Sequence, residues 1–97
     1  MKDIEALCSQ IVEMLHPEKV ILFSRKIHLN GETSSFKLCV VADVADEREA
    51  QKQIYIGLDC DIPYDVVVYR PERFGELREN EGSFAQQIDR TGRVLYG

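Results

Sequence analysis

The chain has 97 residues, 44% of them hydrophobic, which is enough for one small core, so we expect a single domain over residues 1–97. Its 17 acidic and 12 basic side chains give a net charge of -5, which disfavours DNA or RNA as the main partner because no overall positive field would attract a phosphate backbone. No apolar run approaches the ~20 residues of a membrane-spanning helix, and the N-terminal segment lacks the pattern of a signal peptide, so we expect a cytoplasmic protein without membrane association.

The first part of the chain predicts a helix followed by two strands. Apolar residues from Ile4 to Leu15 have the spacing of an amphipathic helix, with Asp3 as its N-cap and His16-Pro17 as its end. The β-branched run 20–23 is typical of a strand covered on both faces. Residues 24–35 contain several turn formers and are predicted to be a loop with at most one helical turn, and a second strand is expected over 36–42.

The second part alternates in the same way. A helix with a thin apolar stripe is expected over 46–58, a strand over 64–69, and a short helix from Pro71 to about residue 77. Ser83 and Gln86 have the spacing of a capping box, Gly92 ends that last helix, and 94–96 form either an edge strand or an apolar tail. This order predicts an α/β (α+β) domain of two or three layers, with a small mixed sheet of three to four strands flanked by helices.

The three cysteines do not indicate a metal or disulfide site. Cys8, Cys39 and Cys60 are odd in number and widely spaced, with no Cys-x-x-Cys pair and no His at ligand spacing. We expect all three to be reduced, with Cys8 and Cys39 as small core residues.

Two charged residues stand in strands that are otherwise suited to burial. Ser35, Lys37 and Cys39 share one face of the second strand, and Asp65 opens the third strand immediately before three valines. A buried carboxylate is costly unless it is paired or binds a metal. The simplest interpretation is that Lys37 reaches solvent along its aliphatic stem and that Asp65 is an exposed residue at the start of its strand.

These positions also carry a resemblance. Ser24 and Ser35 are separated by ten residues, Asp65 is the second residue of the segment YDVVVYRPERF at 64–74, and the segment GSFAQQIDRTGRVLY covers residues 82–96. The chain resembles the minimal nucleotidyltransferases (MNT domains) of the DNA polymerase β-like nucleotidyltransferase superfamily, whose signature is Gly-Ser, ten residues, Asp-x-Asp, and a third carboxylate on a later strand. The resemblance implies a nucleotidyltransferase-like fold and places Phe23-Ser24 on Gly-Ser, Ser35-Phe36-Lys37 on Asp-x-Asp, and Asp65 on the third carboxylate.

The departures from that signature remove the expected metal site. In the family the three carboxylates hold two Mg²⁺ ions, whereas Ser35, Lys37 and Asp65 carry a summed formal charge of zero. At about 4 Å, a moderately screened pair of unit charges is worth on the order of 4 kcal/mol, and a divalent ion facing Lys37 would meet roughly twice that penalty. Phe23 also brings a bulky side chain to a position where Gly lets the backbone approach phosphate. We therefore expect no intact catalytic residues, no bound metal and no cofactor.

Two interpretations of the altered site remain open. In the first, the Lys37 ammonium forms an ion pair with Asp65 on the adjacent strand in place of the metal. In the second, which we rank lower, Lys37 with Arg25 and Lys26 binds a phosphate without metal, which makes Ser24, Arg25 and Lys37 the candidate nucleotide-binding residues. His28 lies alone in the predicted loop without a recognisable nucleophile, and Asp43 and Asp46 lie at the far end of the second strand.

For function, the resemblance implies a catalytically inactive MNT-like protein that acts as a regulatory, antitoxin-like partner of a HEPN-domain protein. The alternative is an active nucleotidyltransferase that uses ATP and Mg²⁺ in an altered site. A third interpretation is a homodimer with a structural role, using apolar surface on the 46–58 helix or on the C-terminal tail. Acidic runs such as 47–49 and 76–81 are more typical of solvated faces than of metal sites.

Overall fold

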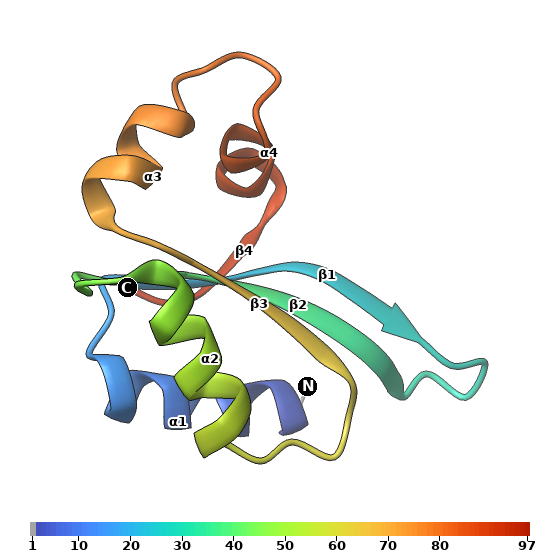
Figure 1. Cartoon of the computed structure of the whole chain (residues 1–97). Coiled ribbons are helices and arrows are strands. Elements are labelled where there is room, and N and C mark those ends of the chain that lie inside the picture. Colours follow the sequence, from blue (N-terminus) through green and yellow to red (C-terminus); the bar gives the residue numbers. More distant parts are fainter. Residues whose placement is uncertain (1) are drawn as a thin grey trace.

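The computed structural model describes residues 2–97 and has three layers (Figure 1). A four-stranded sheet lies in the middle, with two helices on one face and two on the other. The predicted α/β domain with a small mixed sheet is therefore confirmed. The elements, in chain order, are α1 (Lys2–Leu15), β1 (Lys19–Ile27), β2 (Thr33–Val41), α2 (Glu47–Gly57), β3 (Tyr64–Tyr69), α3 (Pro71–Leu77), α4 (Phe84–Thr91) and β4 (Arg93–Tyr96).

The sheet has the strand order β3-β2-β1-β4, which makes β3 and β4 its two edges. β1 pairs with β2 and with β4 in antiparallel fashion, whereas β2 and β3 are parallel, and α2 forms the crossover between them. The C-terminal segment 93–96, for which a strand or a tail was predicted, is the edge strand β4.

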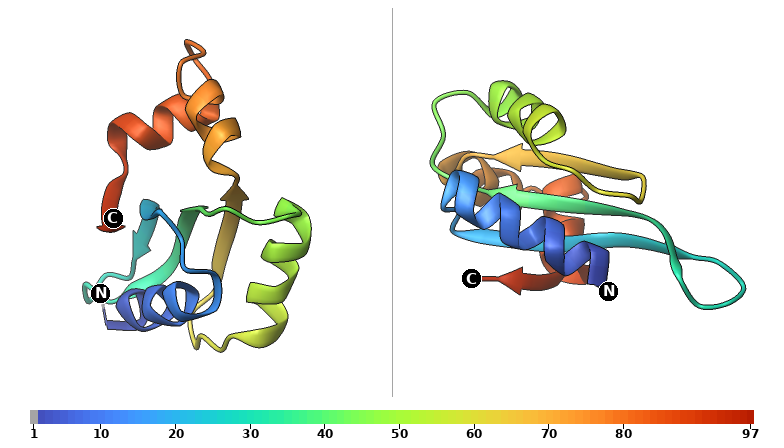
Figure 2. Two further views of the ribbon diagram at one scale, coloured as in Figure 1. Left: turned by 90° about the vertical axis from the view of Figure 1, so that its left-hand side faces the viewer. Right: turned by 90° about the horizontal axis from the view of Figure 1, so that it is seen from below.

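Alternate residues of the strands build two cores. Leu38 and Val40 of β2 pack with α1 and α2 on one face, together with Val66 and Val68 of β3. On the other face, a cluster that includes Cys39 packs under α3 and α4. Figure 2 shows α1 and α2 together on one side of the sheet and α3 and α4 beyond its other side. Both faces of the middle of the sheet are covered, which explains its runs of β-branched residues.

Local signals fix most of the element ends. Pro71 is the first residue of α3, Ser83 caps α4 by accepting from the Gln86 N–H at 3.1 Å, and Asp46 caps α2 by accepting from the Glu49 N–H at 3.0 Å. His16 takes a φ of 47° just after α1, so the helix ends there as predicted. Asp3 was predicted to be an N-cap but lies inside the first turn of α1, where its carboxylate still favours the helix dipole.

The main difference from the sequence prediction lies between residues 24 and 35. This segment was predicted to be a loop, but β1 continues to Ile27 and β2 already begins at Thr33, so the two strands form a projecting hairpin arm (Figure 1). The arm is polar and exposed, and hence lacks the apolar pattern from which strands are recognised in a sequence. A tight turn at its tip, in which the Gly31 N–H donates to the His28 carbonyl oxygen at 2.9 Å, uses a φ of 87° at Gly31. In residues 2–97, no helix is both long and apolar enough to cross a membrane.

Candidate functional site

The structure brings the candidate residues of three separate segments into one row across the sheet. Ser24 of β1 is the direct partner of Lys37 on β2, and Lys37 is the direct partner of Asp65 on β3. Because direct partners on neighbouring strands project to the same face, all three side chains share one face of the sheet. We call Ser24, Lys37 and Asp65 the central row.

The central row lies on the face covered by α3 and α4, one step beyond the part that these helices bury. Cys39, two residues further along β2, is fully buried beneath them, whereas Lys37 and Asp65 are exposed. Ser35, two residues before Lys37, pairs with Lys26 of the arm and lies on this face as well. The sheet therefore emerges from under the helices at the position of the central row, and the polar side chains there contact solvent.

Phe23, at the position where the resemblance implies a glycine, has a packing role in the structure. The pairing of β1 with β2 is irregular between Leu22 and Ser24, and Phe23 occupies that irregularity. Its ring packs edge-to-face on Phe84 of α4, with centroids 5.3 Å apart and planes at 87°. Phe23 thus joins the second core and attaches α4 to the sheet, so the bulky side chain contributes packing next to the central row.

The predicted ion pair between Lys37 and Asp65 is not formed. Their backbones are directly opposite on adjacent strands, as predicted, but none of the ion pairs within residues 2–97 joins these two side chains. Both residues are exposed, and an exposed ion pair is only slightly lower in free energy than two separately hydrated side chains. The two side chains are therefore not held together. Lys37 therefore extends into solvent, in agreement with the simpler of the two sequence interpretations.

Arg25 does not join the other candidate nucleotide-binding residues. It pairs with Phe36, whose side chain is buried in the core on the α1 and α2 side, so Arg25 points to the face opposite the central row. Its Nε donates to the Thr33 hydroxyl at 2.8 Å. Lys26, which the sequence grouped with Lys37 and Arg25 as a possible phosphate-binding residue, does share the face of Lys37.

The site therefore contains two hydroxyls, two ammonium groups, one carboxylate and an aromatic pair. In the described part of the chain, no group of three His, Cys, Asp or Glu side chains is arranged to hold a metal ion. His28 lies in the turn at the tip of the arm, and Asp43 and Asp46 lie beyond the opposite end of β2, as predicted. The hydroxyl, ammonium and carboxylate groups of this surface can each form hydrogen bonds with a ligand or partner.

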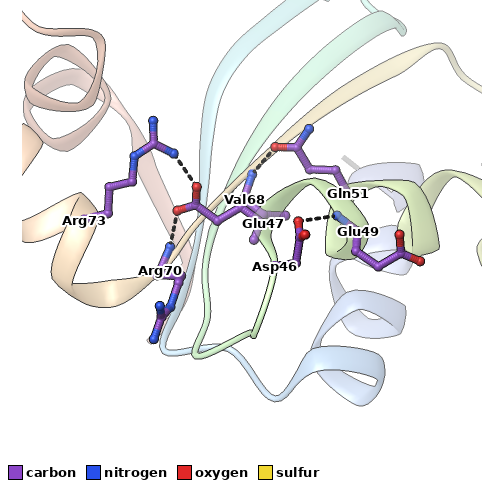
Figure 3. A network of polar contacts seen from close by, with 7 residues as sticks. All are labelled: Asp46, Glu47, Glu49, Gln51, Val68, Arg70 and Arg73. Carbon is purple, nitrogen blue, oxygen red and sulfur yellow. Dashed lines mark hydrogen bonds and ion pairs between the residues drawn. The ribbon is translucent and has the colours of Figure 1, made fainter.

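A second polar cluster lies along the outer edge of β3 and was not predicted (Figure 3). Glu47, Gln51 and Tyr55 recur every four residues on one side of α2, and each accepts a hydrogen bond from a backbone N–H of the strand or the residue after it. The donors are Val66 to Tyr55 Oη at 2.7 Å, Val68 to Gln51 Oε1 at 2.9 Å, and Arg70 to Glu47 Oε2 at 2.8 Å. We call Glu47, Gln51 and Tyr55 the α2 ladder.

The spacing of the α2 ladder follows from backbone geometry. Four residues of helix rise about 6.0 Å, and two residues of strand rise about 6.6 Å, so a helix that runs antiparallel alongside β3 can meet every second N–H of the strand. Glu47 also accepts a charge-assisted hydrogen bond from Arg73 of α3. The prediction that residues 47–49 form a solvated face is therefore wrong for Glu47. The α2 ladder satisfies donors that an edge strand would otherwise expose, which is a structural role.

The thiols lie outside both polar clusters. Burial raises the pKa of the Cys39 thiol from 9.0 to about 12, and burial also raises the pKa of Cys8. Both residues are buried as predicted, and all three cysteines are free. A thiol with a raised pKa is a poor nucleophile, so Cys39 adds no chemistry to the nearby central row.

Comparisons of the chain with protein-family models, with curated proteins and with solved structures found no match.

Proposed function

We propose that this protein is an MNT-like domain that has lost metal-dependent nucleotidyl transfer and acts by binding a protein partner. The proposal is supported by the way in which the motif positions meet. Positions 24, 37 and 65 are far apart in the sequence but adjacent in the central row, and Ser35 lies on the same face. A shared phosphate and metal site requires such a convergence of positions. The residues at these positions supply only one carboxylate, Asp65, and therefore cannot form the metal site.

The single observation that carries the proposal is the combination of Phe23 and Lys37 at this surface. The packed rings of Phe23 and Phe84 stand beside Ser24, where the resemblance implies a glycine turn for phosphate. Lys37, a cationic residue, is the direct strand partner of the remaining carboxylate residue, Asp65. Phe23 blocks close approach of a phosphate to the backbone, and Lys37 repels a divalent cation.

The electrostatic attraction of this surface for a divalent cation can be estimated. Moderately screened unit charges at 4 Å interact by about 4 kcal/mol, and a divalent ion between Lys37 and Asp65 gains from the carboxylate about as much as it loses to the ammonium. The net attraction is then close to zero before the cost of dehydrating Mg²⁺ is counted. Mg²⁺, and ATP that depends on Mg²⁺, should therefore not bind here.

A binding role suits the composition of the same surface. Phe84 is 51% exposed, and its ring packs on Phe23, the chain neighbour of Ser24 in the central row. An exposed aromatic residue within a polar rim is a common arrangement at protein interfaces. The resemblance supplies the kind of partner, a HEPN-domain protein with helical structure, for which this chain would be the antitoxin-like component in the cytoplasm.

Co-expression with the protein encoded by the neighbouring open reading frame tests the proposal, which requires that protein to be a helical, HEPN-type partner. We expect a stable complex that Phe84→Ser weakens by about tenfold or more, since truncation of a central aromatic anchor costs about 2 kcal/mol or more. Ile56→Ser is the matched control, because Ile56 is 75% exposed on α2, away from the central row. Failure to form any complex with such a partner, or equal loss for both variants, contradicts the proposal.

A further inference from the structure

The two edges of the sheet differ in how they are protected. Along β3, the α2 ladder accepts hydrogen bonds from three successive outward N–H groups. Along β4, no side-chain hydrogen bond within residues 2–97 reaches the strand backbone. Figure 2 shows β4 as the outermost strand, with no element beyond it. An open edge with unpaired backbone groups is a template for another strand.

The β4 edge exposes two apolar side chains and borders a groove. Val94 is 50% exposed and Tyr96 is 42% exposed, although natural edges are usually protected by charge. A groove of about 570 Å³ runs between β4 and α1. Its lining includes the partly buried Val12 and Leu95, with Glu5 and Glu13 on the helix side.

The direction of the elements gives this groove a charge pattern. Tyr96 pairs with Val20 just after the end of α1, whereas Arg93 pairs with Leu22 further along β1, so β4 and α1 run in the same direction (Figure 2). Arg93 therefore lies at the Glu5 end of the groove, and Tyr96 lies at the Glu13 end. The Glu13 end holds a carboxylate that no ion pair of the described residues engages.

From this arrangement we infer that the β4 edge and its groove bind a second copy of the chain. A two-fold axis perpendicular to the sheet joins β4 to its symmetry mate in antiparallel fashion, with Arg93 of one copy opposite Tyr96 of the other. Arg93 of each copy then reaches the Glu13 end of the other copy's groove, so the charges are complementary in both directions. The sheet becomes continuous across the dimer, and the two α1 helices lie on the same face and cover the joint.

This assembly is independent of the proposed partner binding. The central row lies on the face of the sheet opposite α1, so the dimer leaves Phe84 and Lys37 accessible. Four residues of strand form few hydrogen bonds, so most of the affinity comes from closing the groove between β4 and α1, and we expect a dissociation constant of roughly micromolar order. The exchange of dimer and monomer is then observable at ordinary protein concentrations.

Sedimentation velocity of the full chain over a range of concentrations tests the inference. We expect a concentration-dependent shift to twice the 11.1 kDa mass of the chain. Glu13→Arg and Arg93→Glu should each weaken the dimer by about tenfold or more, and the double exchange should restore it because opposite charges again face each other. Val94→Lys should abolish the dimer by adding a charge to the edge.

Glu79→Arg is the matched control, since it makes the same charge change on an exposed residue after α3, away from β4. Circular dichroism of each variant verifies that the fold is retained. A chain that stays monomeric up to about 1 mM overturns the inference and leaves the groove to a partner of another kind. A dimer that is insensitive to Val94→Lys and to both single charge reversals also overturns it, because the copies then meet on another surface.

Discussion

Replacing Gln51 by leucine tests the role of the α2 ladder. Gln51 Oε1 accepts from the Val68 N–H at 2.9 Å, and Val68 is 1% exposed, so in Gln51→Leu this donor has neither a protein partner nor free access to water. A buried donor left unpaired costs about 1–3 kcal/mol. Leucine and glutamine have similar helix propensities, so α2 itself should be unaffected. We expect the free energy of unfolding to fall by about 2 kcal/mol, which lowers Tm by about 8–16 °C in a domain of this size.

Thermal and urea unfolding followed by circular dichroism measure this loss. Gln53→Leu is the matched control on the same helix, because Gln53 is exposed and should change stability by less than about 0.5 kcal/mol. Gln51→Glu keeps an oxygen acceptor and should remain close to the unmodified protein at neutral pH. If Gln51→Leu and Gln53→Leu unfold alike, the α2 ladder does not stabilise the edge and this explanation is refuted.

Three further predictions concern other parts of the molecule. The Cys39 thiol has a pKa of about 12 in the folded protein and its usual pKa of 9.0 when unfolded, so the free energy of unfolding falls by up to about 1.4 kcal/mol per pH unit as pH rises from 9.0 towards 12. Cys39→Ala removes this group, so its free energy of unfolding, measured with urea, should depend less on pH over that range. Ser83→Ala removes the α4 cap and should cost about 1 kcal/mol by urea unfolding; an unchanged midpoint would argue against the cap. Joining Ser35→Asp to Lys37→Asp rebuilds three carboxylates with Asp65 and should introduce Mn²⁺ binding, detected as paramagnetic broadening of nearby NMR signals that the unmodified protein lacks.

Much of the fold was predictable because local signals and burial agree. The strand Tyr64–Tyr69 and the helix Pro71–Leu77 match their predicted bounds, since a β-branched run and a proline at the first helical position each favour one structure. The hairpin arm was missed because strand pairing there depends on the partner strand and not on a buried apolar face. Sequence periodicity reports burial, and the arm is not buried.

The candidate site was predictable to a similar degree. The resemblance grouped Ser24, Lys37 and Asp65, and strand pairing does place these three residues side by side. Arg25 was placed with them wrongly because strand alternation was not extended past Phe23. The α2 ladder was not predicted at all. Its members look like an ordinary polar helix face in the sequence, and their role appears only when β3 is known to be an edge.

The most direct test of the central claim is a calorimetric titration of the purified protein with Mg²⁺-ATP. Because Lys37 stands beside Asp65 and Phe23 packs beside Ser24, we predict no heat of binding above dilution, with or without Mg²⁺. Saturable binding that requires Mg²⁺ and is lost in Asp65→Asn would contradict the account, since it would show that this surface still holds a metal-bound nucleotide.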